Sequence, residues 1–275
     1  MPTSPTLSDY AKQQALVAAL LENMRQLHAQ QDVRIVETHI SWVLLVGDRA
    51  YKIKKPLNLG FLDFTGLDAR QFYCAEEIRL NRRLAPDIYL DVVAIGGMPE
   101  VPEFCGQPAI EYAVRMRRFD TSQELDHLLE RGQLMPQHMD KLAATLAAFH
   151  GSLPTAEDDS ALGSPAAIRA AAMQNFEQLL SLLTERDDRE AVEDLQSSTA
   201  QAYAAREKNL MPRHAQGFVR ECHGDLHLGN IVLLNGQPLP FDGIEFNPSF
   251  RWIDVMDEAA FLVMDLLHRK SPALA

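Results

Sequence analysis

The chain has 275 residues, 47% of them hydrophobic and 23% charged, a composition typical of a folded protein with one large domain or two modest lobes. Its formal net charge is −12 and its basic residues are scattered, so nucleic acid, a polyanion, is not an expected partner. The three cysteines lie far apart, and no apolar stretch reaches the roughly 18 residues of a membrane span. We therefore expect a cytoplasmic protein with no membrane partner.

The first part of the chain is predicted to form a helix followed by a sheet. Apolar residues at three- or four-residue spacing predict an N-terminal helix within residues 1–30. The pattern then changes to that of short strands, with one further helix. Strands are predicted over 33–38, 42–46, 50–54, 92–95 and 109–116, and the helix over 68–84. This order favours a five-stranded antiparallel sheet with a helix packed on one face.

The second part of the chain is predicted to be mainly helical. Helices are predicted over 123–131, 136–150, 165–184, 187–208 and 252–268. Before the last of these, Asn235-Gly236 separates two short apolar runs, which indicates a β-hairpin because both turn residues adopt positive φ. The polar loop at 151–165 contains Asp158 and Asp159, which are either solvated or placed to bind a cationic acceptor.

The segment 223–242 contains the residues best suited to chemistry. Asp225 and Asn230 are five residues apart, and Asp242 follows the predicted hairpin. Phosphoryl transfer from ATP requires a carboxylate that orients or deprotonates the acceptor hydroxyl, and oxygen ligands for Mg²⁺. A short loop can direct Asp225 to the acceptor and Asn230 to the metal, and the hairpin then returns Asp242 beside Asn230. Taken singly, Asp225 and Asn230 would be ordinary turn residues.

This spacing matches the protein-kinase signature His-Arg-Asp-Leu-x-x-x-Asn followed by Asp-Phe-Gly. The variant in this chain resembles the aminoglycoside phosphotransferase family, which includes choline-kinase-like enzymes. It reads His223-Gly224-Asp225-Leu226-His227-Leu228-Gly229-Asn230, then Asp242-Gly243. The resemblance implies a bilobal protein-kinase-like α+β fold, with a sheet lobe at 31–118, a helical lobe at 119–275 and ATP between them. It also implies Mg²⁺-dependent phosphorylation of a hydroxyl on a small-molecule acceptor, with Asp225 catalytic and Asn230 and Asp242 on the metal.

Further segments resemble an uncharacterised bacterial branch of this family. These segments are 37–42, 51–56, 61–64, 80–86, 241–247 and 251–255. In that branch the domain is often followed by a P-loop kinase-like domain, but this chain contains no G-x-x-x-x-G-K-[ST]. A P-loop kinase-like partner would therefore be a separate protein. The family also has several helices after the one at 252–268, so we expect the acceptor side to be incomplete.

The resemblance further implies a phosphate-binding lysine on the third strand, positioned by a glutamate from the next helix. Lys52 and Lys54 point to the same face, because strand side chains alternate. Lys52 is favoured, and Lys54 fits a shifted register. Glu77 is preferred to Glu76 as the partner, so Lys52 and Glu77 should lie within about 4 Å of each other.

Three residues are considered as supports of the loop. In the family, His223 is a structural residue that braces the catalytic loop. Asp254 and Asp257 either brace the same loop or merely cap or decorate the last helix. Alternatively, His223, Asp225 and His227 could be the metal ligands of a hydrolytic site, although no further cluster of His or Cys in the sequence supports this.

A non-catalytic alternative concerns the same residues. The sequence has no glycine-rich loop between the first two strands, where only His39-Ile40-Ser41 occupies the bend. A nucleotide-binding regulatory or vestigial pseudokinase module without turnover would share the motifs described above. The identity of the acceptor is not encoded by any motif, because selectivity depends on the shape of the pocket.

Overall fold

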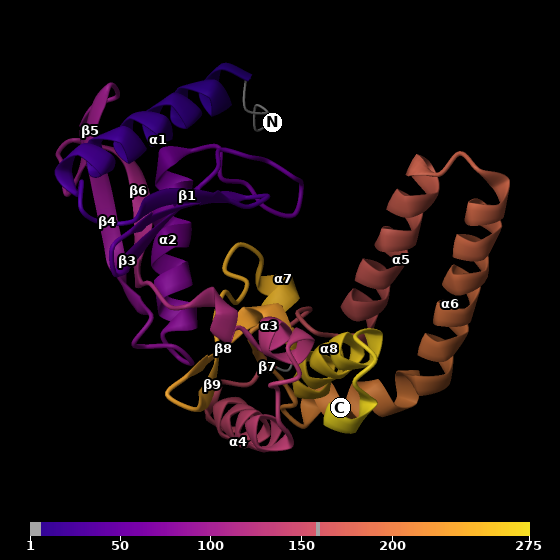
Figure 1. The fold of residues 1–275 in the computed structure, drawn as a ribbon. Helices are drawn as coiled ribbons and strands as arrows, with labels where there is room; N and C mark the ends of the chain where they lie inside the picture. Colours follow the sequence, from indigo (N-terminus) through magenta and orange to yellow (C-terminus); the bar gives the residue numbers. More distant parts are fainter. Residues whose placement is uncertain (1–6, 158–159) are drawn as a thin grey trace.

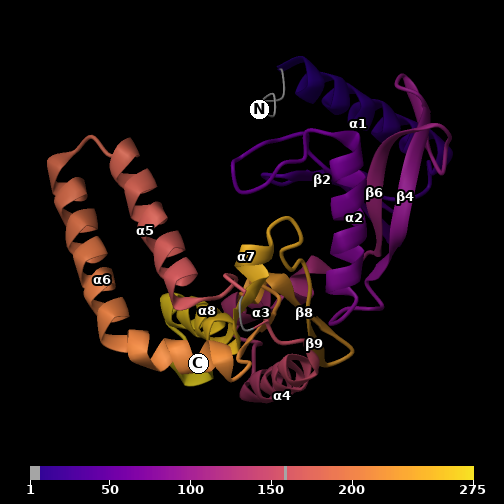
Figure 2. The ribbon, with the colours of Figure 1, turned by 180° about the vertical axis from the view of Figure 1, so that it is seen from behind.

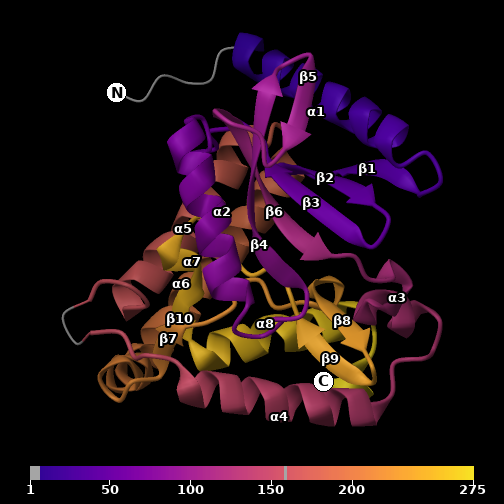
Figure 3. The same ribbon diagram turned by 90° about the vertical axis from the view of Figure 1, so that its left-hand side faces the viewer.

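The computed structural model describes residues 7–157 and 160–275, so Asp158 and Asp159 lie outside the described residues. The described chain forms an antiparallel sheet lobe and a mainly helical lobe, one above the other in Figure 3. The expected α+β class and bilobal arrangement are therefore confirmed. We propose the segment after β6 (Ala109–Arg117) as the boundary between the lobes.

The main sheet has six strands within the described residues, in the order β1-β2-β3-β6-β4-β5, and all neighbours are antiparallel. Besides β6, the strands are β1 (Val33–Glu37), β2 (Ser41–Val46), β3 (Arg49–Lys54), β4 (Tyr89–Met98) and β5 (Val101–Phe104). The predicted count of five was wrong because β5 was taken for a loop. Its Pro102 cannot donate to the ladder, and such a residue is tolerated on an edge strand.

Alternation along the strands gives the sheet two different faces. Ile53 of β3 lies in the hydrophobic core beneath α1 (Leu7–Leu27). Lys52 and Lys54 point to the opposite face, where they contact α2 (Leu67–Asn81). The sheet therefore presents two lysines of one strand to the side that faces the helical lobe.

The helical lobe is built around a core of leucines together with Ile231, the first residue of a short β-hairpin. Its elements are α3 (Leu125–Glu130), α4 (Pro136–Ser152), α5 (Pro165–Leu182), α6 (Arg186–Ala215), β7 (Val219–Glu221), β8 (Ile231–Leu234), β9 (Gln237–Pro240), α7 (Pro248–Arg251), β10 (Trp252–Asp254) and α8 (Val255–His268). The predicted hairpin is confirmed, since Asn235 and Gly236 between β8 and β9 have φ of 51° and 74°. The last helix begins later than predicted, because β10 pairs with β7 first.

Helices α5 and α6 form a hairpin that projects from the helical lobe as a separate arm (Figures 1 and 2). Within this arm, α6 has no buried residue and α5 buries only Phe176. The polar sequence of α6 accounts for its exposure, since few of its side chains gain from leaving water. Among the helices of the described chain, none is both long and apolar enough to cross a membrane.

Candidate active site

A cavity of about 950 Å³ lies between the sheet lobe and the helical lobe. Its walls come from β1 to β3, the segment that follows β6, Asp225, and residues 241–246 with Phe250. The wall on the sheet side is apolar at Val43, Leu45 and Ala50 and ends at Lys52. An apolar wall that leads to a cation provides complementary surfaces for a ligand with a flat apolar part and an anionic part.

The loop that carries Asp225 begins with a glycine that the packing requires. Gly224 has a φ of 86°, and a Cβ at this position would lie 2.7 Å from the carbonyl oxygen of Phe250. The positive φ and the close contact with Phe250 therefore both exclude any residue with a side chain at this position. Beside it, the buried ring of His223 places Nε2 2.9 Å from the Phe241 carbonyl oxygen, and Nδ1 accepts from the Asp225 amide at 3.3 Å. Burial lowers the pKa of His223, which agrees with a neutral ring in this arrangement.

The Asp225 side chain is 39% exposed and lines the cavity. Its Oδ2 accepts a hydrogen bond from Asn230 Nδ2 at 3.0 Å and lies 3.7 Å from His227 Nε2. Burial would raise the pKa of Asp225, but His227, His223 and Asn230 together lower it below its ordinary value. Asp225 is therefore ionised at neutral pH, with its carboxylate accessible from the cavity.

The β8–β9 hairpin brings Asn230 and Asp242 to the same end of the lobe. The Phe241 amide donates to the Asn230 carbonyl oxygen at 2.9 Å, and the Asp242 amide donates to the Tyr89 hydroxyl at 3.0 Å. Asp242 has a positive φ of 61°, and its side chain remains 42% exposed. Because Nδ2 of Asn230 donates to Asp225, the amide oxygen is the atom left for a ligand. Carboxylate and amide oxygens are ligands that Mg²⁺ accepts, so the residues present fit such an ion.

Lys52 and Lys54 both contact Glu77. Lys52 Nζ lies 2.9 Å from one Glu77 oxygen and Lys54 Nζ lies 2.6 Å from the other. Lys52 also pairs with Asp242, and Lys54 pairs with Glu245. The predicted approach of Lys52 to Glu77 is confirmed, as is the common direction of the two lysines. Lys52 lines the cavity, whereas the Lys54 side chain, 1% exposed, lies behind it.

The ion pair between Lys52 and Asp242 is reflected in the pKa of both groups. Burial would lower the pKa of Lys52, but Asp242 and Glu77 raise it well above its ordinary value. Burial would raise the pKa of Asp242, but Lys52 lowers it. Both groups are therefore charged over the physiological pH range, and the cleft contains a cation next to a carboxylate.

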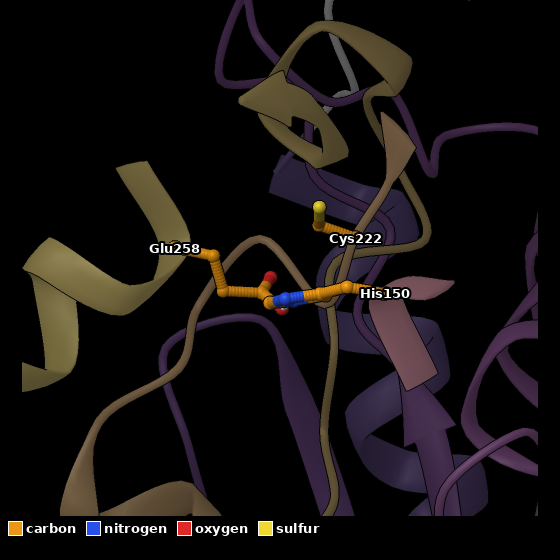
Figure 4. A group of neighbouring side chains, drawn as sticks. All are labelled: His150, Cys222 and Glu258. Carbon is orange, nitrogen blue, oxygen red and sulfur yellow. Dashed lines mark hydrogen bonds and ion pairs between the residues drawn. The ribbon is translucent and has the colours of Figure 1, made fainter. Parts of the chain in front are cut away.

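A buried carboxylate that the sequence did not indicate, Glu258 of α8, contacts the start of the loop that carries Asp225. Figure 4 shows its side chain directed at His150. One oxygen accepts from the amides of His223 and Gly224 at 2.6 and 2.9 Å, and the other lies 2.8 Å from His150 Nε2. His150, Cys222 and Glu258 have ligand atoms within 4.8 Å of one another. We do not assign a metal to this group, because both Glu258 oxygens already accept hydrogen bonds and burial raises the pKa of the Cys222 thiol.

Asp254, considered for the same bracing role, has different partners. Its carboxylate accepts from Arg213 at 2.5 and 2.7 Å and from the Met256 amide at 2.8 Å. Asp254 therefore caps the N-terminus of α8, as the second of the two expectations had it. The carboxylate that contacts the loop of Asp225 is that of Glu258. No local pattern could reveal this role of Glu258, because its partners are backbone amides of a distant segment.

A second set of charges missed in the sequence links the two lobes. Glu221 of β7 accepts from Arg79 of α2 at 2.8 Å and from Arg251 at 3.1 Å, and its carbonyl oxygen accepts from Arg83 at 2.7 Å. α2 therefore contacts the helical lobe through Arg79, the turn after it does so through Arg83, and Glu77 of α2 contacts the lysines of β3. The helix connects the sheet lobe with the segment that precedes the loop of Asp225.

Comparison with known proteins agrees with this geometry. Residues 73–243, more than half of the chain and the part that includes Glu77, Asp225, Asn230 and Asp242, match the sequence model of the Phosphotransferase enzyme family. The chain belongs to this phosphotransferase family. Two curated members of similar sequence are the uncharacterised proteins Rv2004c of Mycobacterium tuberculosis and Mb2027c of Mycobacterium bovis, each 32% identical over 238 residues. The match covers 86% of this chain but 45% of each relative, so the chain spans less than half the length of these relatives.

Two solved structures of phosphotransferases show a distant similarity. One is the amicoumacin kinase hAmiN in complex with AMP-PNP, Ca²⁺ and Ami, with 14% identity and a TM-score of 0.45 over 94% of this chain and 73% of that chain. The other is the aminoglycoside phosphotransferase APH(4)-Ia, with 14% identity and a TM-score of 0.44 over 94% of this chain and 84% of that chain. The substrate of the present phosphotransferase has to be inferred from its own residues.

Proposed function

We propose that this chain is an ATP- and Mg²⁺-dependent phosphotransferase that phosphorylates a hydroxyl group of a small-molecule acceptor. The observation that carries the proposal is that Asp225, Asp242 and Lys52, from three separate segments, line one cavity. The contact of Lys52 with Glu77 and membership of the phosphotransferase family support it further.

In the proposed reaction, the acceptor hydroxyl oxygen attacks the γ-phosphorus of ATP, the bond to the β–γ bridging oxygen breaks, and ADP leaves. Asp225, ionised and accessible, orients the hydroxyl and receives its proton. Lys52, held by Glu77, donates to phosphate oxygens. Asn230 and Asp242 would hold Mg²⁺, which neutralises charge between the β- and γ-phosphates.

The substitution Asp225→Asn tests the catalytic part of this proposal. Asparagine keeps the size of the side chain but removes the charge that attracts the proton, so we expect turnover to fall about 10²-fold or more. Turnover can be followed as ADP release. The rise in melting temperature caused by ATP with Mg²⁺ should persist in the variant, because Asp225 has no proposed role in nucleotide binding. A variant that releases ADP as fast as the wild type would refute the role of Asp225.

A nucleotide-binding module without turnover is the second candidate, and the turn between β1 and β2 is the observation that favours it. The Thr38 hydroxyl accepts from the Ser41 amide at 3.0 Å, and the Thr38 carbonyl oxygen accepts from Lys55 at 2.6 Å. The amides of Thr38 and Ser41 are thus engaged within the turn and are not offered to phosphates. Under this alternative, ATP with Mg²⁺ would still stabilise the protein, but any ADP release would be insensitive to Asp225→Asn.

A further inference from the structure

Three phenylalanine rings from the two lobes meet at one end of the cleft. Phe61 comes from the connection between β3 and α2, Phe246 follows the Asp242 segment, and Phe250 belongs to α7. The ring centroids are separated by 5.9 Å for Phe61 and Phe246, 6.2 Å for Phe61 and Phe250, and 6.4 Å for Phe246 and Phe250. We call these three residues the aromatic triangle.

The aromatic triangle is directly connected to the loop that carries Asp225. Phe246 and Phe250 line the same cavity as Asp225. The backbone of Phe250 packs so closely on Gly224 that a Cβ there would lie 2.7 Å from the Phe250 carbonyl oxygen. A molecule that contacts Phe246 and Phe250 from the cavity therefore shares that cavity with the proposed catalytic carboxylate.

Phe61 is held in place although its side chain is accessible. It lies in a turn closed by a hydrogen bond from the Leu59 amide to the Leu62 carbonyl oxygen at 3.0 Å, and its own carbonyl oxygen accepts from Asn247 at 3.3 Å. Phe61 nevertheless remains 46% exposed, and Phe250 37% exposed. Pre-positioned, exposed aromatic surface beside a cavity stabilises an apolar ligand that covers it.

Among the described residues, the acidic side chains that line the cavity do not form a second binding site for a cation next to the triangle. Asp48, Asp120 and Glu124 lie on the β2–β3 turn and on the segment after β6. Asp242 pairs with Lys52, and Glu245 pairs with Lys54. Of the six acidic residues that line the cavity, Asp225 is the one near the triangle whose carboxylate has no lysine partner. An acceptor with several ammonium groups would therefore find few counter-charges there.

We propose that the aromatic triangle is the acceptor subsite, and that the acceptor is an alcohol with an aromatic or alkyl group rather than a polycationic aminosugar. This inference rests on the proposed phosphotransferase function. The apolar group packs on Phe61 and Phe250, and the hydroxyl reaches Asp225, which receives its proton when the γ-phosphoryl group is transferred and ADP leaves.

Binding of two probes, 4-phenylbutan-1-ol and the polycation kanamycin, tests this assignment. Saturation-transfer NMR titrations of the whole chain measure both affinities without any turnover. We expect the phenyl alcohol to bind more tightly than kanamycin. Phe61→Ala and Phe250→Ala should each weaken binding of the alcohol about tenfold, because each removes one aromatic contact surface.

Phe72→Ala is the matched control, since Phe72 is 58% exposed on α2 and its ring contacts Tyr73 rather than the triangle. Equal binding of the alcohol to the wild type and to both triangle variants, or tighter binding of kanamycin, would overturn the proposal. Melting temperatures with ATP and Mg²⁺ and ADP release, measured on the same samples, report on the phosphotransferase function separately. If the triangle variants lose alcohol binding but ATP with Mg²⁺ neither raises the melting temperature of the wild type nor yields ADP, the subsite stands and the kinase assignment is refuted.

Discussion

At the scale of single residues, Lys52 and Lys54 show what the alternation of side chains along a strand can and cannot predict. Alternation along β3 predicts that both side chains point to one face, and they do. Which lysine can contact a ligand depends on how deeply each side chain is buried. Lys52 lines the cavity, whereas Lys54 lies behind it between Glu77 and Glu245. Depth is set by the packing of α2 and of the segment after Asp242, and no periodicity within β3 encodes that packing.

Substitution of each lysine by methionine should separate the two roles. Lys52→Met removes a donor from the cavity, so we expect the apparent affinity for ATP with Mg²⁺ to fall about tenfold or more, the scale of a lost charge-assisted hydrogen bond. Lys54→Met leaves Glu245 buried without its cation, so it should lower the free energy of unfolding by about 3–5 kcal/mol. Nucleotide titration and urea denaturation of both variants measure the two effects. The reverse assignment, with Lys54 as the phosphate lysine, would give the larger affinity loss in Lys54→Met.

At the scale of elements, the β8–β9 hairpin could be predicted from the sequence, whereas β5 and the contact of α8 with the loop of Asp225 could not. Asn235-Gly236 carries a local backbone requirement, so β8 and β9 were identified correctly. β5 was missed because an edge strand with Pro102 has the composition of a loop. Glu258 was missed because its contacts with His223 and Gly224 depend on how α8 docks, and the sequence of α8 alone shows only an amphipathic helix.

Glu258→Gln tests the support that α8 gives to the loop. Glutamine retains one oxygen, so it cannot keep both the amide contacts and the hydrogen bond with His150 in the same geometry. We expect kcat to fall about tenfold, because a small shift of Asp225 affects the positioned proton transfer. The KM for ATP should change little, since Lys52 and Asp242 are untouched.

The neighbouring exposed residue Asp257 provides the control for this substitution. Asp257→Asn changes charge on the same helix and should leave kcat unchanged, because Asp257 makes no contact with the loop among the hydrogen bonds of the described chain. A Glu258→Gln variant with a raised KM for ATP and normal kcat would show that α8 acts on the nucleotide side instead.

At the scale of the whole molecule, α2 joins the two lobes. It supplies Glu77 to the lysines of β3 and Arg79 to Glu221, and Arg83 in the turn after the helix also contacts Glu221. Asn81 completes the link, since its side-chain oxygen accepts from the Gly243 amide at 2.7 Å. Because α2 contacts both the sheet lobe and the helical lobe, the two lobes are held in a fixed relative position. We therefore expect the cleft between them to keep its shape when nucleotide binds. The interlobe charges were not predictable, because they connect positions far apart in the chain.

The arm formed by α5 and α6 has a consequence for how the molecule tumbles and scatters. A compact chain of this length has a radius of gyration of about 19 Å. At 1.5 Å per residue, the 30 residues of α6 have a contour length of about 45 Å. The last part of α6, which contains Pro212, bends back toward the body, and Figure 1 shows the rest of the arm held away from it. Small-angle X-ray scattering of the monomer should therefore give a radius of gyration above about 19 Å and a pair-distance distribution with a long tail. A symmetric, bell-shaped distribution would instead mean that the arm lies folded against the body in solution.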